Sequence, residues 1–228
     1  MPIIDLRGVA KAFRKGSTEV HALRGVDLAV DPGEVVLVVG PSGGGKSTLL
    51  NLIGGLDRPD SGTVRVAGVD VAASSQRALD TYRRRHVGFV FQFFNLIGSL
   101  TARDNVALAL SARGLHPWSN ARARADALLA DLGLGSRADH RPAELSGGEQ
   151  QRVAIARAVA GEPDLILADE PTGNIDTDAG AVVMAMLHDL NDRLGVTLLI
   201  VTHDVSLTSH ADRVLEMVDG RLGERVGT

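Results

Sequence analysis

A glycine-rich segment at residues 40–48 has the composition of a loop that binds phosphate groups. It consists of Gly40, Pro41, Ser42, Gly43, Gly44, Gly45, Lys46, Ser47 and Thr48. Glycines let backbone N–H groups converge on a β-phosphate, and the helix expected to begin here adds a partial positive charge. Lys46 would bring a full charge to the β- and γ-phosphates, and the Ser47 hydroxyl would bind Mg²⁺. A plain flexible turn is the alternative, but the strand expected before the loop and the helix expected after it favour a nucleotide site.

Two adjacent carboxylates, Asp169 and Glu170, follow a run of buried-strand character at residues 165–168. At the carboxyl end of a strand that faces the phosphate loop, one carboxylate can hold Mg²⁺ through water and the next can polarise the attacking water. We therefore predict that Asp169 serves the metal and that Glu170 is the general base. Without the phosphate loop, a solvated strand exit before Pro171 would be the better interpretation.

A third run, Leu145-Ser146-Gly147-Gly148-Glu149, stands before an expected helix and upstream of the two carboxylates. Taken alone, Ser-Gly-Gly could be a simple helix cap. Together with the phosphate loop, the run resembles the signature of the ABC (ATP-binding cassette) ATPases, usually written LSGGQ. The resemblance implies that Ser146, Gly147 and Gly148 bind the γ-phosphate of an ATP molecule held by a second copy of the chain, again at a helix N-terminus.

Glu149 departs from this signature, in which glutamine is usual. A carboxylate near a triphosphate would weaken binding by like-charge repulsion. Alternatively, Glu149 points along the helix and pairs with Arg152. The sequence leaves both alternatives open.

The same resemblance gives roles to four further residues. Gln92, at the end of a strand, resembles the Q-loop glutamine that reaches the Mg²⁺ site during catalysis, and His203 resembles the switch histidine that contacts the γ-phosphate. Phe13 stands where the family places an aromatic side chain that stacks on adenine. Asp176 lies in a segment similar to the D-loop and is expected at the nucleotide of the other copy. A structural histidine and a strand-end core phenylalanine are the alternatives for His203 and Phe13.

The elements that must position these residues alternate between strand and helix. Strands are expected at residues 3–13, 20–30, 35–39, 63–66, 86–91, 165–168, 197–201 and 214–218. Helices are expected at residues 46–53, 101–113, 122–132, 149–160 and 178–194. Alternating strands and helices favour an α/β fold with a mostly parallel sheet. The continuous apolar run at residues 35–39 predicts a strand buried on both faces.

The predicted fold class is therefore α/β, with a P-loop NTPase core. The resemblance to ABC ATPases adds an N-terminal antiparallel β subdomain and an inserted α-helical subdomain. We expect a single nucleotide-binding domain over residues 1–228. Its ATP-binding core comprises residues 1–92 and 162–228, and a helical subdomain that carries the signature occupies about residues 93–161.

Composition restricts the other classes of function. The net charge of −4 gives no electrostatic reason to expect nucleic-acid binding, and the absence of cysteine excludes disulfides and thiolate metal sites. No apolar run approaches the ~20 residues that cross a bilayer, and the first residues lack the pattern of a secretory signal. We expect a cytoplasmic protein that is peripheral on the inner face of the cell membrane, where another chain supplies the pore or lever.

The resemblance also implies partners. Two copies of the chain would close head-to-tail around ATP and Mg²⁺, and an integral membrane permease subunit would place a coupling helix in a groove of this chain. Phe89 and Phe91 alternate along a strand and are expected in the core, whereas Phe93 and Phe94 break the alternation. Because exposed aromatic side chains suit an interface, we expect the groove near Phe93 and Phe94. Ordinary packing under the helical insert is the alternative for Phe94.

Three stretches, at residues 51–57, 87–92 and 168–174, resemble the lipoprotein-release and macrolide-export branch of the family. That branch implies an exporter or a lever that drives an extracytoplasmic domain. One alternative is the ATPase of a non-transport membrane complex that regulates cell-wall hydrolysis. Another is a soluble ABC ATPase that acts on DNA or ribosomes, which the negative net charge and the lack of long coiled coils disfavour.

Overall fold

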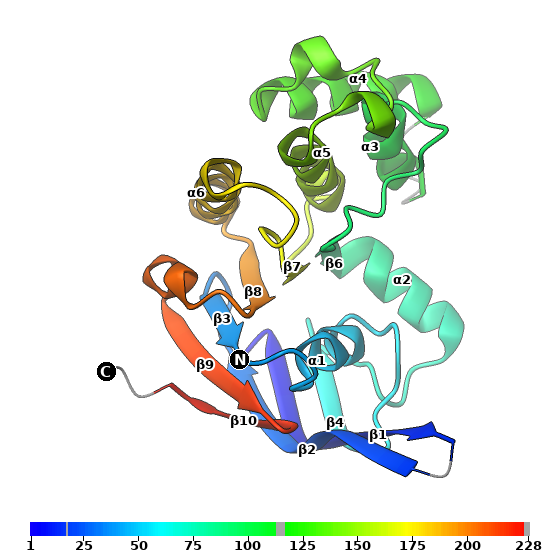
Figure 1. Ribbon diagram of the computed structural model, residues 1–228. Coiled ribbons are helices and arrows are strands. Elements are labelled where there is room, and N and C mark those ends of the chain that lie inside the picture. Colours follow the sequence, from blue (N-terminus) through cyan, green and yellow to red (C-terminus); the bar gives the residue numbers. More distant parts are fainter. Residues whose placement is uncertain (17, 113–116, 226–228) are drawn as a thin grey trace.

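The computed structural model (Figure 1) describes residues 1–16, 18–112 and 117–225. In this part of the chain the strands form two sheets, and α1 (Lys46–Ile53) contacts strands of both. Helices α3 (Ala102–Ala112), α4 (Trp118–Asp131) and α5 (Gly147–Val159) gather at one end of the molecule, opposite the antiparallel sheet (Figure 1).

The larger sheet carries the loops predicted to bind nucleotide. Its strands are β3 (Val35–Val39), β6 (Val87–Val90), β7 (Leu165–Asp169), β8 (Thr197–Thr202), β9 (Arg213–Val218) and β10 (Arg221–Glu224). Their order is β10-β9-β3-β8-β7-β6, and every neighbouring pair is parallel except β10 with β9. All five residues of β3 are buried, and they alternate between two hydrophobic cores, one on each face of the sheet. The prediction of an α/β fold with a mostly parallel sheet is confirmed.

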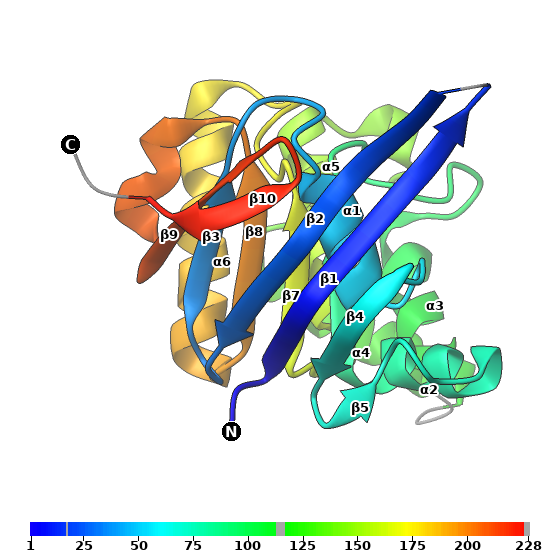
Figure 2. The same ribbon diagram turned by 90° about the horizontal axis from the view of Figure 1, so that it is seen from below.

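The second sheet is antiparallel and covers α1. It contains β1 (Ile4–Lys15), β2 (Thr18–Val30), β4 (Ser61–Val66) and β5 (Val69–Asp70), in the order β2-β1-β4-β5. Ile4 of β1 pairs with Val30 on one side and with Val66 on the other, and all three are buried in the same core as Leu49 and Ile53 of α1. Figure 2 shows β1 and β2 running across α1. The helix that follows the glycine loop is thus held firmly between the two sheets.

Helices cover the opposite face of the parallel sheet. α6 (Thr177–Leu194) buries Val183, Met184 and Leu187 against it, at spacings that place them on one side of a helix. α5 contacts β6, α3, α4 and α6, so it joins the helical end of the molecule to the sheet. Short 3₁₀ turns complete the structure: η1 (Gly135–Arg137), η2 (Pro142–Glu144) and η3 (Val205–His210). Within the residues that the structure describes, no helix combines the length and the hydrophobicity that crossing a membrane requires.

The sequence pattern does not predict helix α2 (Gln76–His86). This helix is rich in arginine and buries only Leu79 and Tyr82, so its apolar periodicity is weak. Ser75 caps its start, because the Ser75 hydroxyl accepts a hydrogen bond from a first-turn N–H group at 3.3 Å. The strand expected at residues 86–91 is shorter than predicted, since β6 begins only after α2 ends. The short strands β5 and β10 are likewise not predicted.

Several helix boundaries also differ from expectation. α5 begins at Gly147 rather than at residue 149, because Ser146 already caps it. α4 begins at Trp118, four residues before the expected start at residue 122. α3 is described to Ala112, and the expected last residue of that helix, Arg113, lies outside the described residues.

Candidate nucleotide-binding site

The order of strands in the parallel sheet brings the predicted catalytic segments to one edge. β3, β8, β7 and β6 are consecutive neighbours, and their carboxyl ends lead into the glycine loop, His203, the Asp169-Glu170 pair and Gln92, respectively. Parallel strands have their carboxyl ends on the same side of a sheet, which is where ligands of open α/β sheets bind. Segments from opposite ends of the chain, such as the glycine loop and His203, therefore lie in one row.

The glycine loop needs glycine at two positions for steric reasons. Gly40 has φ of 156°, and a Cβ placed on it would lie 2.1 Å from the carbonyl oxygen of Met217. Gly45 has φ of 107°, and its Cβ would lie 2.3 Å from the carbonyl oxygen of Ala22. Both contacts are with backbone, which cannot move aside as a side chain could. The loop is thus wedged between β2 and β9, with its N–H groups leading into the start of α1.

Lys46 is the buried cation of this loop, with a relative exposure of 6%. Its Nζ donates hydrogen bonds to the carbonyl oxygens of Gly40 at 2.7 Å and Pro41 at 3.0 Å, and lies 4.0 Å from Glu170 Oε1. Carbonyl groups satisfy only part of the demand of a buried ammonium group for negative charge. The ammonium group is therefore well placed to pair with a phosphate that enters the loop.

Ser47 and Asp169 come together from α1 and β7. The Ser47 hydroxyl donates a hydrogen bond to Asp169 Oδ1 at 3.2 Å. Burial raises the pKa of Asp169, and the hydrogen bond from Ser47 opposes this effect. Among the described residues no cluster of three or more His, Asp or Glu side chains could hold a metal alone. A hydroxyl and one carboxylate beside a phosphate loop fit Mg²⁺, which typically takes few protein ligands and the phosphates of its substrate.

Glu170 has a strained backbone and a fixed carboxylate. Its φ is +47°, in the left-handed region that residues other than glycine rarely occupy. Glu170 Oε2 accepts hydrogen bonds from the Thr202 hydroxyl at 2.9 Å and from the His203 N–H group at 3.3 Å, and His203 Nδ1 lies 2.9 Å from Oε1. The carboxylate therefore sits beside Lys46, where a water molecule next to a γ-phosphate would be within its reach.

Gln92 follows β6 and lies beside the turn after Glu170. Its Nε2 atom is 3.4 Å from the position that a Cβ on Gly173 would take. The backbone carbonyl oxygen of Gln92 accepts a hydrogen bond from the Asn174 side chain at 2.7 Å. Two bonds from Arg157 of α5 anchor the segment just after Gln92. The Arg157 guanidinium donates to the carbonyl oxygen of Asn95 at 2.5 Å and to that of Phe94 at 2.7 Å. Sequence reasoning misses Arg157, because only the folded chain brings α5 to this segment.

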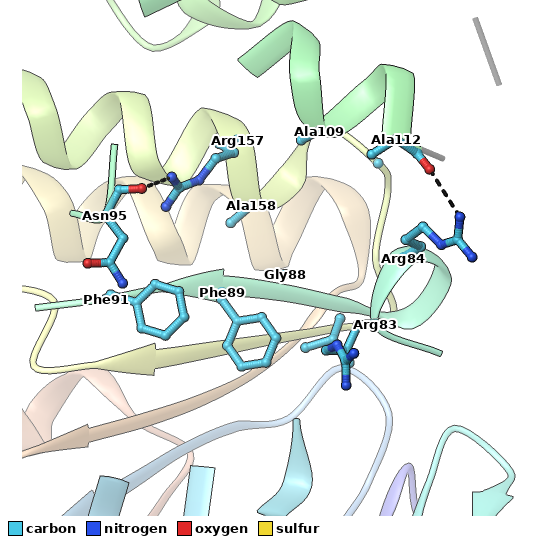
Figure 3. Close-up of a pocket in the computed structure, with 12 residues that line it drawn as sticks. Arg83, Arg84, Gly88, Phe89, Phe91, Asn95, Ala109, Ala112, Arg157 and Ala158 are labelled. Atoms are coloured by element: carbon cyan, nitrogen blue, oxygen red, sulfur yellow. Dashed lines mark hydrogen bonds between the residues drawn. The ribbon is translucent and has the colours of Figure 1, made fainter. Parts of the chain in front are cut away.

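An apolar groove of about 320 Å³ lies between α2, β6 and the helical end of the molecule (Figure 3). Phe89 and Phe91 form its floor and are stacked at 5.3 Å between ring centroids. Both are only half-buried, because β6 is an edge strand of the parallel sheet. Phe89 packs against the core that contains α1, as predicted, whereas the prediction that Phe91 belongs to the core is wrong. Phe93, predicted near a groove, is 73% exposed but does not line this one.

The signature lies in a pocket of its own, about 260 Å³ in volume. The pocket is lined by Ser146, Gly147 and Gly148 at the start of α5 together with Asn174, Ile175 and Asp176 before α6, and no residue of the glycine loop lines it. The Ser146 hydroxyl accepts a hydrogen bond from the Glu149 N–H group at 3.3 Å. Glu149 pairs with Arg137, so the alternative in which it pairs with Arg152 is wrong. One chain therefore holds two half-sites that are separate from each other.

Two further predicted residues have clear surroundings. Phe13 lies in β1 and is 44% exposed, with Lys11 Nζ 5.3 Å from its ring centroid. The alternative of a strand-end core residue is therefore wrong, and the ring is open to a stacking partner. Asp176 caps α6, because its Oδ1 accepts a hydrogen bond from the Ala179 N–H group at 2.9 Å. Asp176 also lines the signature pocket.

Comparison with known proteins reveals extensive similarity. The family model for the ABC transporter matches residues 23–173. The lipoprotein-releasing system ATP-binding protein LolD of Anaeromyxobacter dehalogenans is 50% identical over 221 residues, which are 97% of this chain and 92% of that protein. The macrolide export ATP-binding/permease protein MacB 1 of Aeromonas hydrophila is 49% identical over 219 residues, which are 96% of this chain. The chain spans only 34% of the length of that MacB relative.

A solved structure has the same architecture over the whole chain. It is a dimeric, post-hydrolysis state of the ATP-binding cassette MJ0796 bound to ADP and Pi, with a TM-score of 0.90 and 40% identity. The match covers 99% of this chain and 100% of that one. The likeness confirms the predicted fold, in which an antiparallel sheet, a parallel sheet and a group of helices combine.

Proposed function

This chain belongs to the ABC transporter family, and we propose that it is the ATP-hydrolysing subunit that powers a separate integral membrane permease. The observation that carries the proposal is the row formed by Lys46, Ser47, Asp169 and Glu170 at one sheet edge, with the signature in a separate pocket. The first set can bind a Mg²⁺-triphosphate and activate water. The second set is a helix N-terminus without a phosphate loop of its own.

A dimer joins the two half-sites. We place Lys46, Ser47, Gln92, Asp169, Glu170 and His203 of one copy opposite Ser146, Gly147, Gly148 and Asp176 of the other. Two copies arranged head-to-tail then form two equal composite sites, which is the arrangement expected of a closed symmetric dimer. The dimeric state of the cassette MJ0796 supports this proposal.

Within each site the residues have distinct roles. Bound Mg²⁺ would neutralise phosphate charge, and Ser47 and Asp169 are the residues that would hold it. Lys46 leaves its loop carbonyls to bind the phosphates. Glu170 accepts a proton from the attacking water, and His203 orients the Glu170 carboxylate from its Nδ1 side. Gln92 faces the same edge and links it to the segment that Arg157 anchors. Phe13 offers its exposed ring to the adenine base.

The groove between α2 and α5 is the proposed seat of the permease. It has an aromatic floor and is rimmed by Arg83, Arg84 and Arg157, which suits an apolar helix with polar ends (Figure 3). A chain seated there would place this protein peripherally on the inner face of the cell membrane. The LolD relative, which this chain matches over nearly its whole length, favours lipoprotein release as the work performed, and the MacB relative favours export of a small molecule.

Replacement of the general base tests the proposal. Glu170→Gln should bind MgATP without hydrolysing it and shift from monomer to dimer, as measured by size-exclusion chromatography with light scattering. Asp192→Asn, a carboxylate-to-amide change on the exposed side of α6, is the matched control and should behave as wild type. Ser146→Arg added to Glu170→Gln should abolish the dimer. If Glu170→Gln hydrolyses ATP at the wild-type rate, Glu170 is not the base.

A further inference from the structure

The signature of this chain contains a negative charge that its proposed ligand would repel. Glu149 occupies the third position of α5, directly after the two glycines. Its Oε2 accepts a hydrogen bond from the Ser146 N–H group at 2.8 Å, while the Ser146 hydroxyl accepts from the Glu149 N–H group at 3.3 Å. This reciprocal pair is a capping box, which satisfies two otherwise unpaired donors at the helix start.

Glu149 carries a full charge at neutral pH. Its hydrogen bond from the Ser146 backbone lowers the pKa of the Glu149 carboxyl, and Arg137 lowers it further. The carboxylate therefore lies at the pocket that, on the proposed function, receives a γ-phosphate. Unscreened like charges at such close range would cost binding energy.

The other oxygen of the Glu149 carboxylate, Oε1, forms an ion pair. Arg137 Nε lies 3.0 Å from Glu149 Oε1. Arg137 ends the short turn η1, where its N–H group bonds to the carbonyl oxygen of Leu134 at 2.9 Å and its own carbonyl oxygen accepts from His140 at 2.9 Å. The backbone of Arg137 is thus fixed on both sides, and its side chain reaches α5 from a neighbouring segment 12 residues away.

We propose that Arg137 is a positioning residue for the signature, which neutralises Glu149 and holds the capping box in the geometry that lets Ser146, Gly147 and Gly148 bind phosphate. The inference rests on the proposed function. Both carboxylate oxygens of Glu149 are engaged, by Arg137 and by the Ser146 N–H group, and the Ser146 hydroxyl keeps its own proton to donate. The first-turn N–H groups of the two glycines, which have no acceptor within the helix, face the ligand.

The competing explanation is an ordinary exposed ion pair. Arg137 has a side-chain exposure of 47%, and surface pairs of this kind add little to stability. An ordinary pair would change ATP-driven association no more than any other surface pair. Removal of a neutralising residue should instead weaken ATP-driven association only while Glu149 is charged.

A double-mutant cycle in the Glu170→Gln chain separates the two explanations. Dimer dissociation constants would be measured in saturating MgATP for the parent, Arg137→Ala, Glu149→Gln and the double variant. We expect Arg137→Ala to weaken the dimer by about tenfold, because each dimer contains two such sites with an unpaired carboxylate. Glu149→Gln should lie within about twofold of the parent, and adding it to Arg137→Ala should restore association to within about twofold.

Controls guard against a general loss of structure. Arg124→Ala removes another exposed arginine that is paired with a carboxylate, Glu162, and should leave dimerisation unchanged. The defect of Arg137→Ala should shrink as salt rises from 50 to 500 mM, since charge repulsion is screened. Circular dichroism would establish that every variant is folded.

The outcomes are distinguishable. If the parent Glu170→Gln does not dimerise with MgATP, the proposed function fails and this inference fails with it. If the parent dimerises and Arg137→Ala matches it, or if Glu149→Gln does not rescue Arg137→Ala, the neutralising role of Arg137 is overturned while the proposed function stands.

Discussion

Arg157→Ala should loosen the segment that follows Gln92. The Arg157 guanidinium donates to the carbonyl oxygens of Asn95 at 2.5 Å and Phe94 at 2.7 Å. Phe94 and Asn95 have φ of 59° and 49°, so both are in the left-handed region. Such a conformation costs free energy for residues other than glycine and persists only where other contacts enforce it. Arg157 provides that enforcement, and its truncation frees the segment.

The size of the effect follows from these two bonds. A hydrogen bond to a charged group contributes about 1.5–3 kcal/mol net, so two such bonds contribute about 3–6 kcal/mol. Arg157 lines the open groove, where water can reach both carbonyl oxygens once the side chain is gone. We therefore expect about half of that figure, a loss of roughly 1.5–3 kcal/mol in the free energy of unfolding. In a domain of this size the melting temperature should fall by about 3–12 °C.

Urea and thermal unfolding would measure the loss, and steady-state ATPase assays would measure its consequence for Gln92. Because Gln92 lies only two residues before Phe94, we expect kcat to fall more than KM rises. Arg157→Lys can reach only one of the two carbonyl oxygens at a time and should show about half the loss. Arg84→Ala is the matched control, since Arg84 lines the same groove but donates only to the carbonyl oxygen of Asp80 within its own helix, at 3.1 Å, and to that of Ala112 at 3.5 Å. A loss for Arg157→Ala within about 0.5 kcal/mol of that for Arg84→Ala would refute the reasoning.

Two further predictions concern stability. Asn105 is buried and donates through Nδ2 to three carbonyl oxygens, while its Oδ1 accepts from the Ile97 N–H group at 2.8 Å, so Asn105→Ala should cost about 2–4 kcal/mol in urea unfolding. A loss below about 1 kcal/mol would show that water replaces these bonds. The pKa of Glu149 is lowered in the folded state. Its carboxylate therefore contributes fully to the free energy of unfolding at pH values above its unfolded-state pKa, and this contribution is lost as pH falls through its folded-state pKa. The melting temperature of Glu149→Gln should therefore lie furthest below wild type at pH 7 and approach it below about pH 4, and a gap that stays constant across this range would contradict the assignment.

Features set by local sequence could be predicted well. The run Val35–Val39 is uniformly apolar and β-branched or leucine, and it forms the doubly buried strand β3. The glycine loop, the strand ending in Asp169 and the signature each carry their chemistry within a few residues. Their meeting at one edge follows from the rule that parallel strands share the direction of their carboxyl ends. The identity of these residues and their place at one sheet edge could therefore be predicted, whereas the distances between their side chains could not.

Features set by contacts between distant segments could not be predicted. Whether Phe89 and Phe91 are buried depends on which strand of the sheet is the edge, and the sequence does not give the strand order. The partner of Glu149 is Arg137, on a short turn 12 residues earlier, whereas helical spacing suggested Arg152. Arg157 likewise contacts a segment 62 and 63 residues away. In each case the deciding neighbour comes from another element, and no periodicity within one element reports it.

Helix α5 connects these separate findings. Ser146 caps its start at the signature pocket, and Arg157 near its end holds the segment after Gln92 from within the groove. The two positions are 11 residues apart, or about 16 Å along a continuous helix. Helix α5 is continuous between these positions and packs against α3, α4, α6 and β6. On the proposed seating of the permease, a helix that presses on Arg157 would act on Gln92 through two hydrogen bonds and on the signature through α5. Both half-sites would then respond to one contact, although they belong to the nucleotides of two different copies. Arg157→Ala should consequently reduce stimulation of ATP hydrolysis by the permease more than it reduces basal hydrolysis, and equal reduction of the two rates would show that the groove does not act through Arg157.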